Sequence, residues 1–172
     1  ASRRANNAKS FFSAVHAKTG IPVTIVSGLK EAELTWKGAL LGLPIEHSSY
    51  AVVDLGGGST EIVHGDLQIA HLVQAHSLEI GTVRLTESFF GSDPQRYDPE
   101  SYAAMRAAIS KQVASVDWSQ VPSAIIAVAG TATTLGAMEL GLTQWDRQQV
   151  HGTKLNQNAL QVWIERLLHS NP

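Results

Sequence analysis

Ala51-Val-Val-Asp-Leu-Gly-Gly-Gly-Ser-Thr-Glu-Ile-Val63 is the stretch that decides the fold of this chain. An apolar run leads into Asp54, three glycines follow, and the chain returns to β-branched residues after Glu61. This order predicts a strand, a tight glycine turn and a second strand. Because glycine has no Cβ, the N–H groups of such a turn can approach a ligand closely. The stretch therefore predicts a hairpin whose turn binds a small group.

Carboxylates flank the turn, and hydroxyl residues follow the glycines. Asp54 ends the first expected strand and Glu61 comes early in the second, so both side chains could face one pocket. Backbone donors, hydroxyls and two acids together suit a phosphate with a divalent metal ion. The alternative is a plain glycine hairpin between two buried strands. Asp54 before the turn and Ser59-Thr60-Glu61 after it favour the phosphate site.

The length of 172 residues suits one domain, or one domain with part of another. A hydrophobic fraction of 44% suffices for a sizeable core, and 16% charged residues is low for a disordered chain. The net charge of -2 gives no general attraction to DNA or to an anionic membrane. Cysteine is absent, which excludes disulfides and thiolate metal sites. No apolar run could span a bilayer and no signal-peptide pattern occurs, so we expect a cytoplasmic protein.

Before the glycine turn, the sequence predicts a helix, a strand and a second helix. Apolar residues at helical spacing precede Thr19-Gly20, a β-branched run at 23–26 reads as a short buried strand, and 29–41 reads as a helix. Glu31 and Glu33 lie in the first turn of that second helix, where the helix dipole favours an acid. Spacing alone therefore gives neither glutamate a chemical role.

After the glycine turn, Gly65-Asp66 reads as a two-residue hairpin and 67–77 as a third antiparallel strand. Helical spacing then runs over 78–90, with Thr82 as an N-cap or as a hydroxyl beside the pocket. Arg84 would lie in the first turn of this helix. Its guanidinium could face a phosphate or pair with Glu87.

The last third of the chain predicts an α/β continuation. A long amphipathic helix begins near Pro99, and the apolar run 124–129 is typical of a strand covered on both faces. Gly130 and Thr131 open the next helix, where glycine and hydroxyl residues at a helix N-terminus suit an anion but also cap many ordinary helices. A final amphipathic helix covers 156–169. The order of elements predicts an α/β fold with a mixed sheet flanked by helices, which suggests a ribonuclease-H-like half.

Five segments resemble one known family, the exopolyphosphatase / guanosine pentaphosphate phosphohydrolase (Ppx/GppA phosphatase) family. The resemblance runs in order over nearly the whole chain. It is carried by Arg3-Arg-Ala-Asn-Asn7, Val26-Ser-Gly-Leu-Lys-Glu-Ala32, Val53-Asp-Leu-Gly-Gly-Gly-Ser-Thr-Glu61, Ser77-Leu-Glu-Ile-Gly-Thr-Val-Arg-Leu85 and Ala129-Gly-Thr-Ala-Thr-Thr-Leu135. This resemblance implies the actin-like ATPase fold, the fold of actin, hexokinase and the heat-shock chaperones. In that fold two ribonuclease-H-like domains enclose a phosphate cleft.

The resemblance also assigns roles. It makes Glu31 the base that acts on the attacking water, although Lys30 stands where the family usually has a further acid. It makes Asp54 and Glu61 ligands of Mg²⁺. The expected phosphate contacts are Gly56, Gly57, Gly58, Ser59, Thr60, Gly130 and Thr131, with Arg84 and Arg3 as lesser candidates. The implied reaction is hydrolysis of a terminal phosphoanhydride bond in polyphosphate or guanosine pentaphosphate.

The chain departs from the family in two places. The family's first phosphate loop, of the type Asp-x-Gly-Ser-Asn-Ser, is absent, and so is the stretch after the last helix. We therefore expect residues 1–42 to be the tail of a first domain with an inter-domain helix, and 43–172 to be a second domain truncated at its C-terminus. The missing first-domain segment is then an expected partner, a homodimer is a further candidate, and the fragment alone should be weakly active or inactive.

Two other functions remain open from the sequence. A kinase or ATPase of the same fold would need a purine pocket and an acceptor site, and the Ser-Gly-x-x-Glu-Ala context of Glu31 argues against it. A non-catalytic phosphate-binding domain would have lost turnover. The presence of Glu31, Asp54 and Glu61 argues against that function, whereas the missing first loop is compatible with it.

Overall fold

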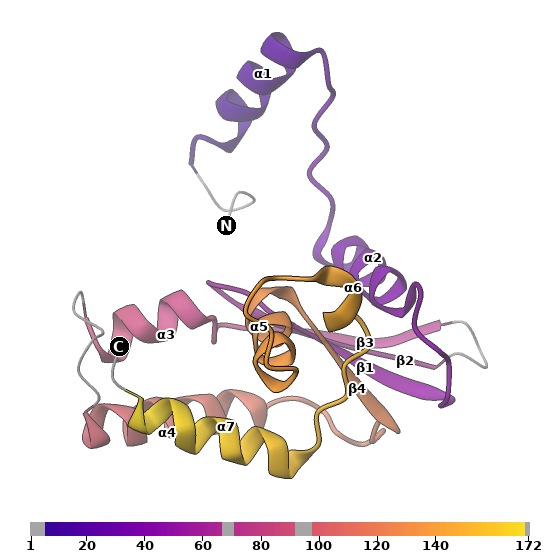
Figure 1. Ribbon diagram of the computed structural model, residues 1–172. Coiled ribbons are helices and arrows are strands. Elements are labelled where there is room, and N and C mark those ends of the chain that lie inside the picture. Colours follow the sequence, from indigo (N-terminus) through magenta and orange to yellow (C-terminus); the bar gives the residue numbers. More distant parts are fainter. Residues whose placement is uncertain (1–5, 67–70, 92–97, 171–172) are drawn as a thin grey trace.

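A four-stranded mixed sheet forms the centre of the chain, and the computed structural model describes residues 6–66, 71–91 and 98–170 (Figure 1). The strands are β1 (Ser49–Leu55), β2 (Thr60–Asp66), β3 (His71–Leu78) and β4 (Ala124–Val128). Their order in the sheet is β3-β2-β1-β4. The strand β2 runs antiparallel to both of its neighbours, β1 and β3, and β4 runs parallel to β1. The expected glycine hairpin and the mixed sheet are confirmed.

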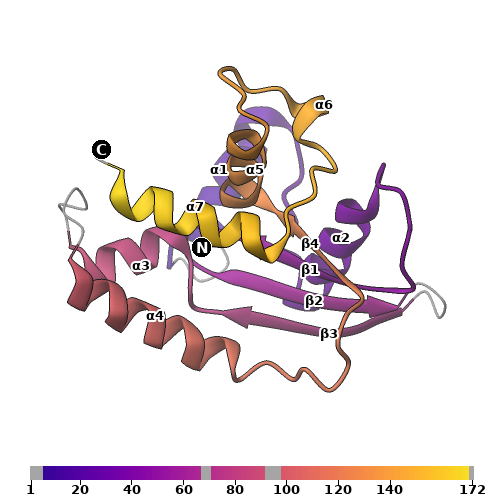
Figure 2. The same ribbon diagram turned by 60° about the horizontal axis from the view of Figure 1, so that its bottom comes forward.

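Helices flank the sheet, as expected for an α/β fold (Figure 2). They are α1 (Ala8–Thr19), α2 (Gly28–Leu40), α3 (Thr82–Phe89), α4 (Pro99–Val113), α5 (Ala129–Glu139), α6 (Arg147–Val150) and α7 (Gln157–His169). Several helices begin with a residue whose side chain accepts a hydrogen bond from a backbone N–H of the first turn, because these N–H groups have no partner within the helix. Ser27 caps α2, Asp98 caps α4 just before Pro99, and Asn156 caps α7. No described helix is long and apolar enough to cross a membrane.

One face of the sheet is covered by α2 and α5. Ala32 and Trp36 of α2 form a buried cluster with Val52 of β1 and Val63 of β2. Gly65 lets the indole of Trp36 lie directly against the β2 backbone, since a Cβ at this position would be 2.2 Å from the ring. Asp54 and Glu61, which lie two residues along their strands from Val52 and Val63, are on this same face.

The opposite face is covered by the end of α4 and the segment that follows it. Ile62 and Leu78 from the sheet pack with Val116, and the partly buried Trp118 joins this second cluster. His64 lies on the same face, 4% exposed, with its ring centroid 5.2 Å from that of Trp118. Among the described residues, neither ring nitrogen of His64 has a hydrogen-bond partner.

Folding stability should fall as the pH drops below about 6.5, because burial in the folded chain disfavours the charged form of His64. Burial chiefly lowers the pKa of His64 from its ordinary value of 6.5; nearby His76 lowers it further, and Asp117 opposes the change. Between the lowered pKa and 6.5 the unfolded chain binds a proton that the folded chain does not, so the unfolding free energy rises with pH, by at most about 1.4 kcal/mol per pH unit. Urea unfolding at pH 5–8 measures this slope. His64→Phe should flatten it and His16→Gln, at an exposed position, should not; an unchanged slope in His64→Phe would contradict the prediction.

Two turn and strand predictions are wrong. Gly65 and Asp66 lie inside β2, where they pair with Leu72 and His71 of β3, so the connection lies further along, at 67–70, outside the described residues. The glycine at 65 serves the packing of Trp36 and not a turn. The helix expected over 78–90 begins only at Thr82, because Leu78 still belongs to β3, and its N-cap is Gly81.

The predicted strand at 23–26 is also absent: this segment is extended, and it is in none of the strands of the described sheet. Val23 and Ile25 are 40% and 49% exposed, so the segment is not buried either. It links α2 to α1, which stands away from the sheet and has no buried residue (Figure 1). A β-branched run forms a strand only where another strand offers its backbone groups, and this segment meets none here.

The strand β4 has the predicted place but not the predicted environment. Its side chains alternate between partly buried and exposed, and Ile125 is 62% exposed. Only the face with Ile126 and Val128 packs against the α2 cluster. The expectation that this run is covered on both faces is therefore wrong.

Candidate active site

Asp54 and Glu61 face each other across the glycine hairpin. They are directly opposite in the β1–β2 register, and side chains of such pairs have Cβ atoms about 4.5–5.5 Å apart. Burial raises the pKa of Asp54 above its ordinary value of 3.8, and the neighbouring charge of Glu61 raises it further. Two carboxylates held this close repel each other unless a proton or a cation lies between them. A carboxylate pair of this kind, on one face of the sheet, has the chemistry to bind a cation.

Hydroxyl groups fix the orientation of Glu61. Ser59 Oγ donates to Glu61 Oε1 at 2.7 Å, and Ser77 Oγ donates to the same oxygen at 3.1 Å. Ser77 is also the β3 residue paired with Glu61 in the sheet, so Asp54, Glu61 and Ser77 form one row across three strands. Sequence reasoning missed Ser77, because its role depends on the β2–β3 register; its place in a motif was the only signal.

The turn itself lies against the start of α3. Gly56 N–H donates to Ser59 O at 3.0 Å and closes the turn. Arg84 Nε donates to Gly58 O at 2.8 Å, and its Nη1 lies 3.7 Å from Glu79 Oε2. Glu79, and not the expected Glu87, is therefore the acid that this guanidinium meets.

Thr60 differs from the other hydroxyl residues of the turn. It is 3% exposed, and its Oγ1 donates to Ile80 O at 2.6 Å. In β2 its side chain is on the same face as Ile62, which is the face opposite to Glu61. Its hydroxyl thus ties the hairpin to the loop that leads into α3.

The second expected phosphate loop begins beside the acids. Val128 of β4 pairs with Asp54 in the parallel register, and α5 starts at the next residue, Ala129. Gly130 and Thr131 consequently lie at the same edge of the sheet as the glycine hairpin. Ala129 has φ +71°, the left-handed region that a residue with a side chain rarely adopts. Such strained backbone is common at functional sites.

Glu31 lies in the first turn of α2, on the helix that covers the acid-bearing face. Trp36 packs over Gly65 at the far end of β2, and α2 has its N-terminal end toward the hairpin edge (Figure 1). The next residue, Ala32, packs in the cluster of Val52 and Val63, the same-face neighbours of Asp54 and Glu61. The first turn of α2 is therefore directed to the end of the sheet that carries the acids.

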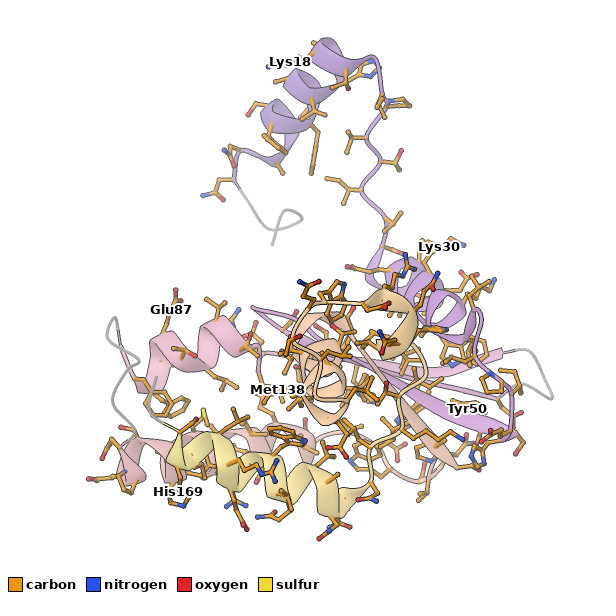
Figure 3. The ribbon with its side chains drawn as sticks, in the orientation of Figure 1. Lys18, Lys30, Tyr50, Glu87, Met138 and His169 are labelled. Atoms are coloured by element: carbon orange, nitrogen blue, oxygen red, sulfur yellow. The ribbon has the colours of Figure 1, made fainter. Side chains whose placement is uncertain are left out.

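The other charges at the start of α2 form a surface network. Figure 3 shows Lys30 on the outer side of the helix, and its Nζ donates to Glu33 Oε2 at 3.0 Å. Lys37 Nζ donates to Glu33 Oε1 at 2.7 Å, and the hydrogen bonds from Lys37 and then Lys30 lower the pKa of Glu33 to about 2. Glu33 is thus engaged in ion pairs on the helix surface.

The described part of the chain contains neither Arg3 nor a cluster of three metal-ligating side chains. Arg3 lies outside the described residues. Within them, no group of three or more His, Asp or Glu side chains could hold a metal ion, so Asp54 and Glu61 form a pair and not a complete cage.

Known proteins resemble this chain over nearly its whole length. The model of the Ppx/GppA phosphatase family matches residues 1–171. Exopolyphosphatase 2 of Mycobacterium tuberculosis is 34% identical over 154 residues, which are 88% of this chain and 47% of that protein. The bifunctional 3-dehydroquinate synthase/phosphatase of Fusobacterium nucleatum is 29% identical over 163 residues, which are 93% of this chain and 24% of that protein.

Solved structures give the same result. The crystal structure of the Aquifex aeolicus member of the Ppx/GppA family superposes with a TM-score of 0.82 at 30% sequence identity, covering 99% of this chain and 53% of that chain. This chain thus spans about half the length of the exopolyphosphatase and of the solved structure. The expected resemblance is confirmed, and the chain belongs to the Ppx/GppA phosphatase family.

Proposed function

We propose that this chain is part of an enzyme that hydrolyses terminal phosphoanhydride bonds of inorganic polyphosphate, of guanosine pentaphosphate, or of both. The observation that carries the proposal is the row of Asp54, Glu61 and Ser77 beside the glycine turn. Oriented carboxylates next to exposed backbone donors suit a phosphate chain with its counter-cation. The exopolyphosphatase related to this chain supports the same reaction class.

Mg²⁺ fits this donor set. Its preferred ligands are oxygens, and it is usually held by one or two carboxylates together with water and substrate phosphates. Asp54 and Glu61 would supply those carboxylates, and neutralising their mutual repulsion would help to bind the cation. When bound, Mg²⁺ would offset charge on the phosphoryl oxygens.

Glu31 would act as the general base. It would take a proton from water, whose oxygen forms a bond to the terminal phosphorus while the bridging P–O bond breaks in line with it. The bridging oxygen would leave as the new end of the shortened chain. Gly56, Gly57, Gly58 and Ser59 would hold the phosphoryl oxygens from one side, and Gly130 and Thr131 would hold them from the other.

Residues 1–42 would be the tail of a first domain with the inter-domain helix, and residues 43–172 most of a second domain. The exposed extended segment at 23–26 supports this division, because it has the sequence of a strand and no partner here. A phosphate cleft between two domains would require the complete first domain, so the chain alone should be weakly active or inactive. Such an enzyme would work in the cytoplasm.

Phosphate release tests the proposal. The full-length protein should release orthophosphate from long-chain polyphosphate or from guanosine pentaphosphate without any added nucleotide, and a chelator should abolish the release. A kinase or ATPase of the same fold would instead need a nucleotide and an acceptor. Tight polyphosphate binding with no release in either assay would favour a non-catalytic phosphate-binding domain and overturn the proposal.

A further inference from the structure

Three consecutive carbonyl groups of the glycine turn accept hydrogen bonds from the first turn of α3. Thr82 N–H donates to Gly56 O at 3.0 Å, and Arg84 N–H donates to Gly57 O at 3.0 Å. The third bond comes from the Arg84 side chain, whose Nε donates to Gly58 O at 2.8 Å. The N-terminal donors of this helix are thus used to bind the turn.

These bonds determine where the amide groups of the turn point. In a planar trans peptide the C=O of one residue and the N–H of the next point in opposite directions. With the carbonyls of Gly56, Gly57 and Gly58 directed to α3, the next three N–H groups point away from it. A row of N–H groups that share one direction forms a concave anion site.

Close packing holds the turn in this position. A Cβ at Gly81 would lie 2.3 Å from the carbonyl carbon of Gly57 and 2.4 Å from Gly58 N, so only glycine lets α3 approach this far. On the other side of the contact, a Cβ at Gly57 would be 3.2 Å from Val83 Cγ2. The turn therefore has little freedom to rotate its peptide groups while α3 stays in place.

We propose that Arg84 is a positioning residue, whose guanidinium aims the amide groups of the glycine turn and does not itself contact the phosphate. Its Nε donates a hydrogen bond to Gly58 O, and its Nη1 lies 3.7 Å from Glu79 Oε2, so one edge of the guanidinium is bonded to the turn and the other faces an acid. Lysine would keep the positive charge but has no donor at the Nε position of the fork. The inference rests on the proposed function only for the identity of the ligand.

Arg84→Lys and Arg84→Gln in the full-length protein separate positioning from direct contact, and Arg106→Lys on α4 is the matched control. The first readout is amide hydrogen exchange at Gly56, Thr82 and residue 84, whose N–H groups form the bonds between the turn and the helix or close the turn. Both Arg84 variants should exchange roughly tenfold faster there, because a hydrogen bond from a charged group is lost. Arg106→Lys should leave these amides unchanged. This readout does not need a substrate.

The second readout is kcat/KM for polyphosphate at low and high salt. For a positioning residue, Arg84→Lys should lose about as much activity as Arg84→Gln, by a factor that does not change with ionic strength. Unchanged exchange at the three amides in Arg84→Lys would overturn the inference, and so would a lysine variant that keeps activity while the glutamine variant loses it. An inactive wild type would contradict the proposed function alone, because the exchange experiment still decides the role of Arg84.

Discussion

Glu31→Gln in the full-length protein is expected to lower the turnover of polyphosphate by about 10²–10⁴-fold, the usual contribution of a general base. Glutamine has nearly the shape of glutamate but cannot take a proton from water. Glu31 is exposed in the first turn of α2 and glutamine keeps its size, so the fold and substrate binding should change little. Single-turnover phosphate release measures the chemical step, and a binding assay with the same substrate measures affinity.

Glu33→Gln is the matched control for this prediction, since it removes an acid from the same helix turn. Its carboxylate is bonded to Lys30 and Lys37 on the surface of α2, and this ion-pair network has no expected part in the reaction. Turnover should stay within about twofold of wild type, because surface ion pairs contribute little. Near-normal turnover in Glu31→Gln would remove Glu31 from the mechanism, and equal losses in both variants would indicate a general effect on α2.

The parts of the fold that depend on neighbouring residues could be predicted from the sequence. The glycine hairpin and the start of α4 at Pro99 follow from turn chemistry and helical spacing, which act over a few residues. The placement of Asp54 and Glu61 on one face also follows, because strand alternation and a short turn determine their pairing.

The parts that depend on distant residues could not be predicted. The run at 23–26 has strand propensity but no partner strand, and one face of β4 stays exposed, which no local pattern reveals. The sequence predicts Gly65 as a turn residue, but glycine is needed there because the indole of Trp36, on another element, packs against its backbone. Ser77 reaches Glu61 through the β2–β3 register, which is defined only once the sheet has formed.

The proposed role of Glu31 also belongs to the parts that local sequence patterns do not predict. Its position in a helix N-terminus is explained fully by the helix dipole, and only the family resemblance gives it chemistry. The structure adds that α2 packs its Ala32 against the same strands that carry the acid pair. Local sequence patterns therefore explain why an acid occurs at position 31, but they do not reveal that this part of α2 packs against the strands of the acid pair.

Asp54→Asn is expected to lower turnover at least about 100-fold while the folded chain becomes no less stable. Loss of groups that only support metal ligands already costs about 10–100-fold, so loss of a proposed ligand should cost at least the upper end. The free energy of unfolding at pH 7, in contrast, should stay the same or rise. The pKa of Asp54 is raised by burial and by Glu61, so its carboxylate stabilises the fold only when protonated, below about pH 4, and this contribution is lost as the pH rises through the raised pKa. At pH 7 a neutral asparagine therefore removes a repulsion and no favourable interaction.

Urea unfolding at pH 7 and a Mg²⁺ titration of turnover test both halves of this prediction. Asp54→Asn should need more Mg²⁺ for half-maximal activity, whereas Glu31→Gln should not, because only the first removes a proposed ligand. Asp117→Asn is the control on the opposite face: hydrogen bonds from Ser119 lower the pKa of Asp117, so its carboxylate supports the fold at pH 7, and its loss should reduce stability and leave turnover unchanged. A clear loss of stability in Asp54→Asn would show that Asp54 is a structural residue. An unchanged Mg²⁺ requirement would show that the acid pair is not the metal site. The two halves of the prediction belong together, because a residue that is present for function often lowers the stability of the fold. Its replacement then removes activity without reducing the free energy of unfolding.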